Sequence, residues 1–283
     1  EIEQVLAEHQ QMLAFEPPYF GAHATLGGAI ACGLSGPRRP YAGAARDYVL
    51  GVRCLNGKGE ILKFGGEVMK NVAGFDASRL MVGALGTLGI LLDISVKVLP
   101  RPEQEITHSH EYSSAEAITR MNDWARQSLP VSAMCHDGER LYVRLSGTPL
   151  GIADAQQKLG GEVVSNADNF WRSVREHRHA FFQGDDALWR LSLKPATPPL
   201  SIVGQRFIEW GGAQRWLKTA LPTKIIRASA NRAGGHATLF RGGDRQGSVF
   251  QPLSATMLTI HRRLKEAFDP HGILNPGRLY QDF

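Results

Sequence analysis

The stretch ATLGGAIACGLSGP, residues 24–37, decides the fold, because glycines and small side chains crowd it between a helix-like segment and a predicted hairpin. Gly27, Gly28, Gly33 and Gly36 carry no Cβ, so their amides can approach phosphate oxygens or the edge of a ring system. A tight turn beneath a core helix explains the same composition equally well, since the spacing matches neither G-x-G-x-x-G nor the P-loop. The stretch therefore predicts a loop that either holds a ligand or packs internally.

A β-rich region follows this stretch. Residues 48–55 and 60–64 are runs rich in strand formers, and the Asn56-Gly57-Lys58-Gly59 link between them predicts a hairpin. A second glycine-rich turn, GALGTLGI at residues 83–90, leads into a run that alternates apolar and polar residues up to Leu99. That alternation predicts a half-buried strand with Leu92, Ile94, Val96 and Val98 on its apolar face. We expect residues 25–37 and 86–90 to face one groove, because both segments end beside strands of one sheet.

The part of the chain after Pro100-Arg101-Pro102 is more charged and more helical in pattern. Ser113 or Ser114 can cap a helix that has Glu116 in its first turn. The periodicity of this part predicts helices over residues 113–126, 151–159 and 256–268, and strands over 141–145, 189–193 and 205–210. This β-α-β-β-α-β order predicts a ferredoxin-like or related α+β sheet domain.

Composition narrows the class of protein. The 283 residues are 43% hydrophobic and 21% charged, values typical of a globular protein. No apolar stretch approaches the ~20 residues that span a bilayer, and the net charge of +5 is scattered rather than gathered in a nucleic-acid-binding patch. The three cysteines, Cys32, Cys54 and Cys135, lie far apart without C-x-x-C spacing. We therefore predict a cytoplasmic protein with no metal site and no nucleic-acid partner, and a peripheral position at the inner face of the cell membrane is left open.

The order of these features resembles the second FAD-binding lobe of the vanillyl-alcohol-oxidase superfamily, which has the PCMH-type FAD-binding fold. Within it, the chain is similar to the E-subunit family of bacterial glycolate oxidases. Five strings across the chain carry the resemblance: FEPPYFGAHATLGGAIACGLSGPRRP, DYVLGVRCLNGKGE, FGGEVMKNVAGFDASRLMVG, RAGGHATLF and NPGRLY. The third string contains a Lys70-Asn71-x-x-Gly74-Phe75-Asp76 turn that we count among the family features.

The resemblance implies an α+β fold with a discontinuous first domain. Residues 1–100 would form the FAD-binding lobe, 101–255 the α+β cap domain, and 256–283 a C-terminal helix and tail that return to the FAD lobe. Because the chain begins at Glu1 inside a helical pattern, we expect it to lack the first FAD lobe. In this superfamily glycine-loop amides of both lobes hold the FAD phosphates, so we expect the 283-residue chain to bind FAD poorly by itself.

The same resemblance assigns a cofactor site. The residues implied to face the pyrophosphate, flavin or adenosine of FAD are Gly27, Gly28, Ala31, Cys32, Gly33, Gly36, Gly86, Thr87, Gly89 and Ile90. Asn275, in the closing segment, would approach the flavin ring system. An Asn-Pro turn after a helix is the structural alternative for Asn275.

His236 is the candidate for a site histidine, because the preceding Gly234 and Gly235 leave space for a ligand and an imidazole titrates near neutral pH. Oxidation of a 2-hydroxy acid requires a base for the hydroxyl proton and a cation for the carboxylate, while the flavin receives the hydride. His236 with Arg232 or Arg227 can supply both catalytic groups. A histidine that serves only packing remains the alternative.

The resemblance implies an FAD-dependent oxidoreductase subunit that takes part in oxidation of glycolate, a 2-hydroxy acid, to glyoxylate. Its partners would be a second flavoprotein subunit and an iron–sulfur subunit, since this chain has no cysteine cluster for an iron–sulfur centre. The sequence lacks the H-x-G-D-G-N motif that hydroxy-acid-oxidising members carry on the cap, and it has Ala84-Leu85 where Ser-Glu is widespread. A non-catalytic assembly subunit with a vestigial FAD fold is therefore the alternative function.

Overall fold

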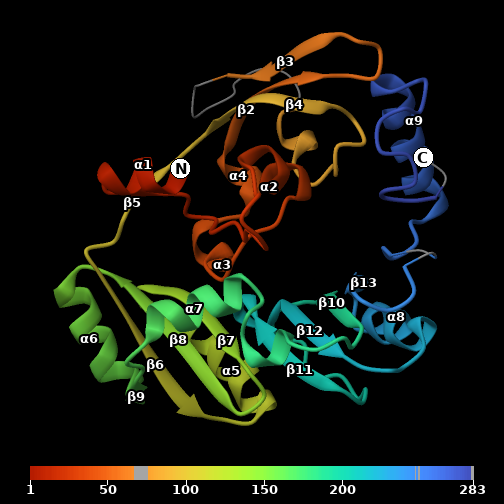
Figure 1. The fold of residues 1–283 in the computed structure, drawn as a ribbon. Coiled ribbons are helices and arrows are strands. Elements are labelled where there is room, and N and C mark those ends of the chain that lie inside the picture. The colour runs from red at the N-terminus through yellow and green to blue at the C-terminus, as the bar shows by residue number, and fades with distance from the viewer. Residues whose placement is uncertain (67–75, 246, 248, 282–283) are drawn as a thin grey trace. The chain divides into compact units, whose positions relative to one another are not determined.

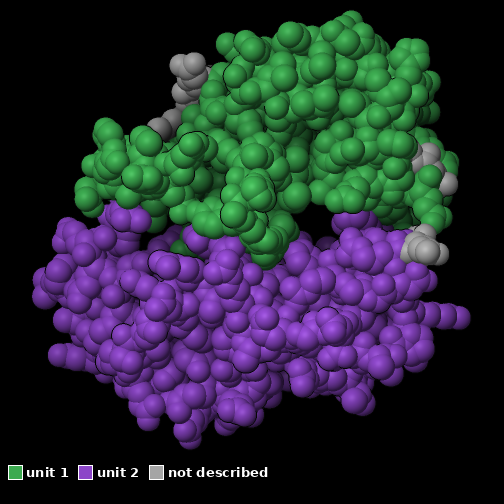
Figure 2. All heavy atoms as spheres, viewed as in Figure 1, with its two compact units in different colours: residues 1–36, 43–100, 252–283 green, residues 37–42, 101–251 purple. Residues whose placement is uncertain are grey.

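The computed structural model describes residues 1–66, 76–245, 247 and 249–281, which form two compact units (Figures 1 and 2). The first unit consists of residues 1–36, 43–100 and 252–283, and the second of residues 37–42 and 101–251. Residues 37–42, which the sequence boundaries assign to the first domain, therefore pack with the second unit. Most of the predicted Lys70–Asp76 turn lies outside the described residues.

The first unit contains short helices, a three-stranded sheet and one long terminal helix (Figure 1). Its elements are α1 (Ile2–Glu8), β1 (Gln11–Met12), α2 (Leu26–Cys32), α4 (Ala45–Tyr48), β2 (Val49–Leu55), β3 (Ile61–Gly65), η1 (Arg79–Met81), β4 (Ile90–Val96), β5 (Leu99–Pro100) and α9 (Ala255–Phe268). The strands β3, β2 and β4 lie in that order and all pair antiparallel, so the predicted hairpin is confirmed. Phe15 and Tyr48, both fully buried, pack with tilted rings at 5.5 Å between ring centroids and belong to the core of this unit.

The apolar face predicted for β4 is interrupted. The pairing of β2 with β4 shifts register between Arg53 and Cys54, which leaves Leu92 opposite no residue of β2. Such a bulge turns the following side chains to the other face. Leu92 is accordingly 42% exposed, whereas Ile94 and Val96 are partly buried. The predicted common face of Leu92 with Ile94 is wrong for this reason.

The C-terminal helix and tail belong to the first unit, as the fold prediction requires. Ser254 caps α9 by accepting a hydrogen bond from the Met257 amide. At the other end, the Gly57 amide of the β2–β3 turn donates to the carbonyl of Phe268 at 2.9 Å. A side chain at position 57 would collide with Asp269, so the turn and the end of the helix meet through a glycine. The return of the tail to this lobe is confirmed.

The second unit is built on one eight-stranded antiparallel sheet with the order β13-β10-β12-β11-β7-β8-β6-β9. Its strands are β6 (Gln104–Glu111), β7 (Val131–His136), β8 (Arg140–Gly147), β9 (Glu162–Val163), β10 (Leu188–Ser192), β11 (Gln205–Glu209), β12 (Gln214–Lys218) and β13 (His236–Arg241). Its helices are α3 (Arg39–Ala42), α5 (Ser114–Ala125), α6 (Pro149–Leu159), α7 (Ala167–Arg175), η2 (Ala180–Phe182), η3 (Trp210–Gly212) and α8 (Thr223–Arg232).

This sheet consists of a ferredoxin-like half joined edge to edge to a second half that has the same strand order but no helix in the described residues 193–204 between β10 and β11. In the first half, β6, β7, β8 and β9 follow the β-α-β-β-α-β chain order, and their order in the sheet corresponds to 4-1-3-2. The strands β10 to β13 repeat the same spatial order, and the two halves meet where β7 pairs with β11. The α+β prediction is confirmed, and the duplication was not foreseen.

Helices cover both faces of this sheet. Apolar residues of α5 and α6 pack on the first half, and those of α8 pack on Leu191, Ala237 and Leu239 of the second half. The helix α7 packs on the opposite face, where Leu188 and Trp216 lie. None of the helices in the described ranges combines the length and hydrophobicity that a membrane-spanning segment requires.

The capping signals read from the sequence are present in the second unit. Ser113 and Glu116 form the capping box of α5, as their spacing predicts. The sequence also suggests a helix over residues 173–181, but α7 ends at Arg175 and His177 takes a φ of 52°. A left-handed residue cannot continue a right-handed helix, so the chain turns there.

Candidate functional site

The glycine-rich stretch forms the helix α2 instead of the predicted loop. Thr25 caps it, since its hydroxyl accepts a hydrogen bond from the Gly28 amide at 3.0 Å. Gly33 ends it in the left-handed conformation, with φ of 62°. Two glycines in the first turn cost roughly 1 kcal/mol each relative to alanine, but the cap and the apolar residues that follow offset this cost.

The second glycine-rich turn joins the end of α2. The amides of Gly83 and Leu85 donate to the carbonyls of Ile30 and Ala31 at 3.0 and 2.8 Å, which satisfies two acceptors that the helix end leaves open. A Cβ on Gly33 would lie 2.9 Å from the Gly83 Cα, so the two backbones touch. The two glycine-rich stretches thus touch through residues 83 and 85, while a groove shared by residues 25–37 and 86–90 stays a prediction.

The exposed side of α2 carries the small residues that could admit a ligand. A Cβ at Gly27 would meet nothing within 4 Å, and Gly28 is exposed. Cys32 is also exposed, and Ala31 is partly so. Of the residues assigned to the cofactor, these four leave room for one.

Two other assigned glycines have a packing role instead. A Cβ at Gly36 would lie 2.4 Å from the carbonyl oxygen of Glu16, and Gly36 is buried. A Cβ at Gly89 would lie 2.9 Å from Met81 and 3.1 Å from the carbonyl oxygen of Leu55. Packing alone explains why both positions need glycine. Their contact with FAD stays a prediction.

Asn275 reaches the second glycine turn from the tail. Its Nδ2 donates to the carbonyl of Leu85 at 2.7 Å. A Cβ on Gly86 would lie 2.8 Å from that Nδ2, and Gly86 has a φ of 72°. The hydroxyl of Thr87 is buried and donates to the carbonyl of Ala84, so Thr87 braces the turn. Ile90, next to the turn, is 53% exposed.

A buried lysine fixes the tail against this turn. Lys265 Nζ donates to the carbonyls of Thr87 and Leu274, at 2.8 and 2.7 Å, and to Asp269 Oδ2 at 2.6 Å. Asp269 also accepts from the amides of Ile273 and Leu274. Burial would raise the pKa of Asp269, but the hydrogen bonds from Lys265 and from the two amides outweigh it and lower the pKa. Nothing in the local sequence indicates that this pair is buried.

Arg278 brings a cation to the exposed side of α2. Burial raises the pKa of the Cys32 thiol, and the charge of Arg278 nearby opposes that rise. Glycines and small side chains that allow close approach, together with an exposed guanidinium, are features that fit a dinucleotide's pyrophosphate. The residues at α2, the glycine turn and the tail therefore suit the phosphate and ring portions of FAD.

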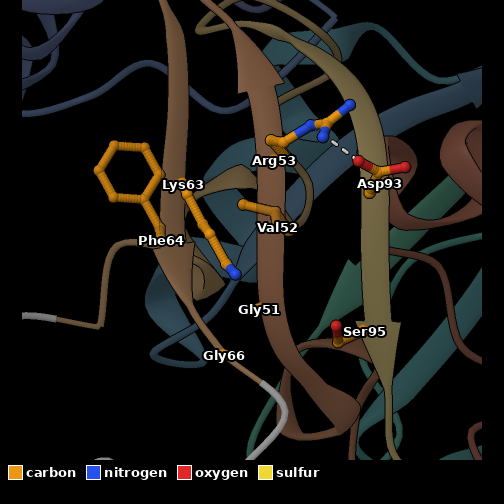
Figure 3. Close-up of a pocket in the computed structure, with 8 residues that line it drawn as sticks. All are labelled: Gly51, Val52, Arg53, Lys63, Phe64, Gly66, Asp93 and Ser95. Atoms are coloured by element: carbon orange, nitrogen blue, oxygen red, sulfur yellow. Dashed lines mark ion pairs between the residues drawn. The ribbon is translucent and has the colours of Figure 1, made fainter.

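A cavity of about 290 Å³ lies elsewhere on the first unit, against the β3-β2-β4 sheet (Figure 3). Arg53 and Asp93 form an ion pair of 2.8 Å at one end, and their side chains are 52% and 64% exposed. Exposed pairs contribute little to stability. None of the residues assigned to the cofactor lines this cavity, so it is separate from the candidate site.

The two candidate catalytic residues lie in the second unit, on different elements. His236 begins β13, and its exposed side chain alternates with Ala237, which packs on α8. Arg232 ends α8 and donates to the Ser229 hydroxyl at 3.2 Å. Because α8 covers the face of the sheet opposite to His236, the structure does not pair these two side chains. Their catalytic roles stay predictions.

The glycines before His236 serve the turn from α8 into β13. Gly234 has a φ of 73°, and a Cβ on Gly235 would lie 2.1 Å from the carbonyl oxygen of Ser192. Sequence reasoning attributed them to ligand approach, whereas their glycine requirement comes from a tight connection. Burial, and then the charge of Arg190, lower the pKa of His236. A neutral imidazole can accept a proton near neutral pH.

Comparison with known proteins shows which family this chain belongs to. Residues 1–65 match the FAD binding domain family, and residues 242–279 match the family of FAD linked oxidases, C-terminal domain. The chain is 47% identical over 281 residues to glycolate oxidase subunit GlcE of Escherichia coli K12, which covers 99% of this chain and 79% of that protein. The chain belongs to the FAD-linked oxidase family. The matched regions contain both α2 and the tail.

Two further similarities cover a smaller share of the matched protein. Glycolate oxidase subunit GlcD of Bacillus subtilis 168 is 40% identical over 96 residues, or 34% of this chain and 20% of that protein. A solved structure of alkyldihydroxyacetonephosphate synthase matches with a TM-score of 0.64 at 15% identity, covering 97% of this chain and 62% of its own. The chain thus spans less than two thirds of that structure, and the likeness concerns the fold of this FAD-linked oxidase.

Proposed function

We propose that this FAD-linked oxidase is the FAD-binding subunit of a multi-subunit enzyme that oxidises glycolate or a closely similar 2-hydroxy acid to the 2-oxo acid. The observation that carries the proposal is the junction of α2, the second glycine turn and the tail in a member of this family. The relatives named as glycolate oxidase subunits support the substrate class and the presence of several subunits. A second flavoprotein subunit and an iron–sulfur subunit are the proposed partners.

Several residues of the first unit would hold the cofactor. Gly27 and Gly28 would let the cofactor approach the open side of α2, since they carry no side chain there, and Arg278 would add positive charge for the phosphates. Asn275, held by Leu85 and by the anchored tail, would orient the ring system. Bound FAD would supply a two-electron acceptor for the substrate C–H bond.

On the second unit, His236 is the proposed proton acceptor, since its lowered pKa keeps the imidazole neutral. Arg232 was the predicted cation for the substrate carboxylate and remains one candidate. We further propose a cytoplasmic location, because the free thiols Cys32, Cys54 and Cys135 suit a reducing compartment.

The alternative function, a non-catalytic assembly subunit, is favoured by the missing H-x-G-D-G-N motif. Reconstitution of the complex separates the two. We expect a complex assembled with a flavin-free variant of this subunit to lose glycolate-dependent dye reduction, while its partner subunits remain associated. Glycolate oxidation at the wild-type rate by that complex would favour the assembly role and overturn the proposed one.

A further inference from the structure

One buried lysine holds both the second glycine turn and the tail. Lys265 Nζ donates to the carbonyl of Thr87 in the turn and to that of Leu274, the residue before Asn275. The side chain of Lys265 is 7% exposed, and that of its ion-pair partner Asp269 is fully buried. An ammonium group offers three N–H donors, and the two carbonyls with the carboxylate of Asp269 accept all three. A shift of Lys265 therefore breaks at least one of these hydrogen bonds.

The turn and the tail meet a second time through Asn275, a residue assigned to the cofactor. Its Nδ2 donates to the carbonyl of Leu85 at 2.7 Å, and its backbone has a left-handed φ of 43°. Asn275 is exposed, so water competes for this hydrogen bond and its net contribution is small. The buried, charge-assisted hydrogen bonds of Lys265 are stronger. They therefore decide where Asn275 lies relative to the turn.

The β2–β3 turn supports the lysine's partner from the other side (Figure 1). The Gly57 amide donates to the carbonyl of Phe268 at 2.9 Å, and a Cβ at Gly57 would lie 2.2 Å from Asp269 Oδ1. The turn is itself fixed, because the buried side chain of Asn56 accepts hydrogen bonds from two backbone amides of the same turn. The turn thus limits the space that Asp269 can occupy.

We propose that Lys265 and Asp269 are positioning residues of the FAD site, and that the β2–β3 turn sets their place. This inference rests on the proposed function and adds to it a connection from the turn, through Asp269 and Lys265, to Asn275. Neither Lys265 nor Asp269 would touch the cofactor, because both side chains are buried and bonded within the protein. They would instead hold the glycine turn and Asn275 at the separation that FAD requires.

The first test disturbs the pair from the turn, away from the residues assigned to the cofactor. In G57A the new Cβ should displace Asp269, and with it Lys265. Titration of the deflavinated complex with FAD, followed by flavin fluorescence, should then show affinity about 10- to 100-fold weaker, since each hydrogen bond lost to a ligand costs roughly tenfold. The FAD site of the flavoprotein partner is the internal reference, because its affinity should not change.

The matched control is G59A in the same turn. A Cβ at Gly59 meets nothing within 4 Å, although its φ of 78° strains any other residue. G59A should therefore bind FAD as the wild type does.

A second pair of variants separates position from stability. K265M leaves the buried carboxylate of Asp269 without its partner and should lose both stability and FAD. In K265M/D269N that charge is gone, and the amide oxygen can still accept a hydrogen bond from the tail. The unfolding midpoint should recover in part, whereas FAD affinity should stay low, because no ammonium group joins Thr87 to Leu274. The absorbance spectrum of the bound flavin should also differ from that of the wild type.

Two outcomes would overturn the inference. One is FAD affinity that recovers together with stability in K265M/D269N, since the lysine would then act through folding alone. The other is a folded G57A variant, as judged by circular dichroism, that binds FAD as tightly as G59A. Either result leaves the proposed function standing. A wild-type complex that holds no flavin in this subunit, or does not oxidise glycolate, would instead contradict the proposed function itself.

Discussion

Replacing Lys265 with methionine should destabilise the protein by about 3–5 kcal/mol, since it leaves Asp269 charged, buried and without its partner. Methionine also removes the hydrogen bonds that Lys265 Nζ donates to the carbonyls of Thr87 and Leu274. For a chain of this size the loss corresponds to a fall of roughly 6–20 °C in the unfolding midpoint. Differential scanning calorimetry measures it, and hydrogen exchange at the Leu274 amide should rise.

The control for this experiment lies on α6. Lys158 and Asp154 form an ion pair with the same i,i+4 spacing, but their side chains are 56% and 60% exposed. K158M should change the free energy of unfolding by only about 0.3–0.5 kcal/mol. Equal losses in K158M and K265M would show that burial of the Lys265 pair contributes nothing.

The Lys265–Asp269 pair predicts that the stability of the folded protein depends on pH. Because the pKa of Asp269 is lower in the folded protein than in the unfolded chain, its contribution is fully present above the unfolded pKa, near 3.8. The contribution is lost as the pH falls through the folded pKa. The difference in stability between wild type and K265M should therefore persist at neutral pH and shrink only in strong acid.

Replacing Gly86 with valine should cause a large loss of bound FAD. Valine strongly disfavours the φ of 72°, and its Cβ would meet Asn275 Nδ2 at 2.8 Å. Strain of about 1–3 kcal/mol, relieved by release of the tail, should weaken FAD binding by roughly 5- to 150-fold. Flavin fluorescence during titration of the deflavinated complex measures the change.

Gly59 provides the matched control. It has a φ of 78° in the β2–β3 turn, but a Cβ there meets nothing within 4 Å. G59V should therefore carry the backbone strain without touching the tail, and it should retain FAD. Similar FAD loss in both variants would assign the effect to general destabilisation and remove Gly86 from the site.

The regular elements could be predicted from the sequence because their signals are local. The capping box at Ser113, the hairpin turn at residues 56–59 and the periodicity of α9 depend on neighbours within a few residues. The helix α2 was missed for the opposite reason. Glycine content suggested a loop, but the hydroxyl of Thr25 and the contact of Gly33 with Gly83 decide the conformation.

The candidate site was only partly predictable. Asn275 and the glycine segments were found because they belong to strings shared with a family. Lys265 was not, because an i,i+4 Lys–Asp pair reads the same on a buried helix end as on an exposed one. Burial of the pair depends on tertiary contacts that no sequence period records.

The central claim is that α2, the second glycine turn and the tail of this subunit form part of an FAD site in the complex. The most direct measurement is the flavin content of this subunit, separated from its partners after purification of the intact complex and extracted for quantification against protein. The account predicts FAD in an amount equimolar with this subunit, and its loss in G86V. A subunit that carries no flavin while its flavoprotein partner retains its own would contradict the account.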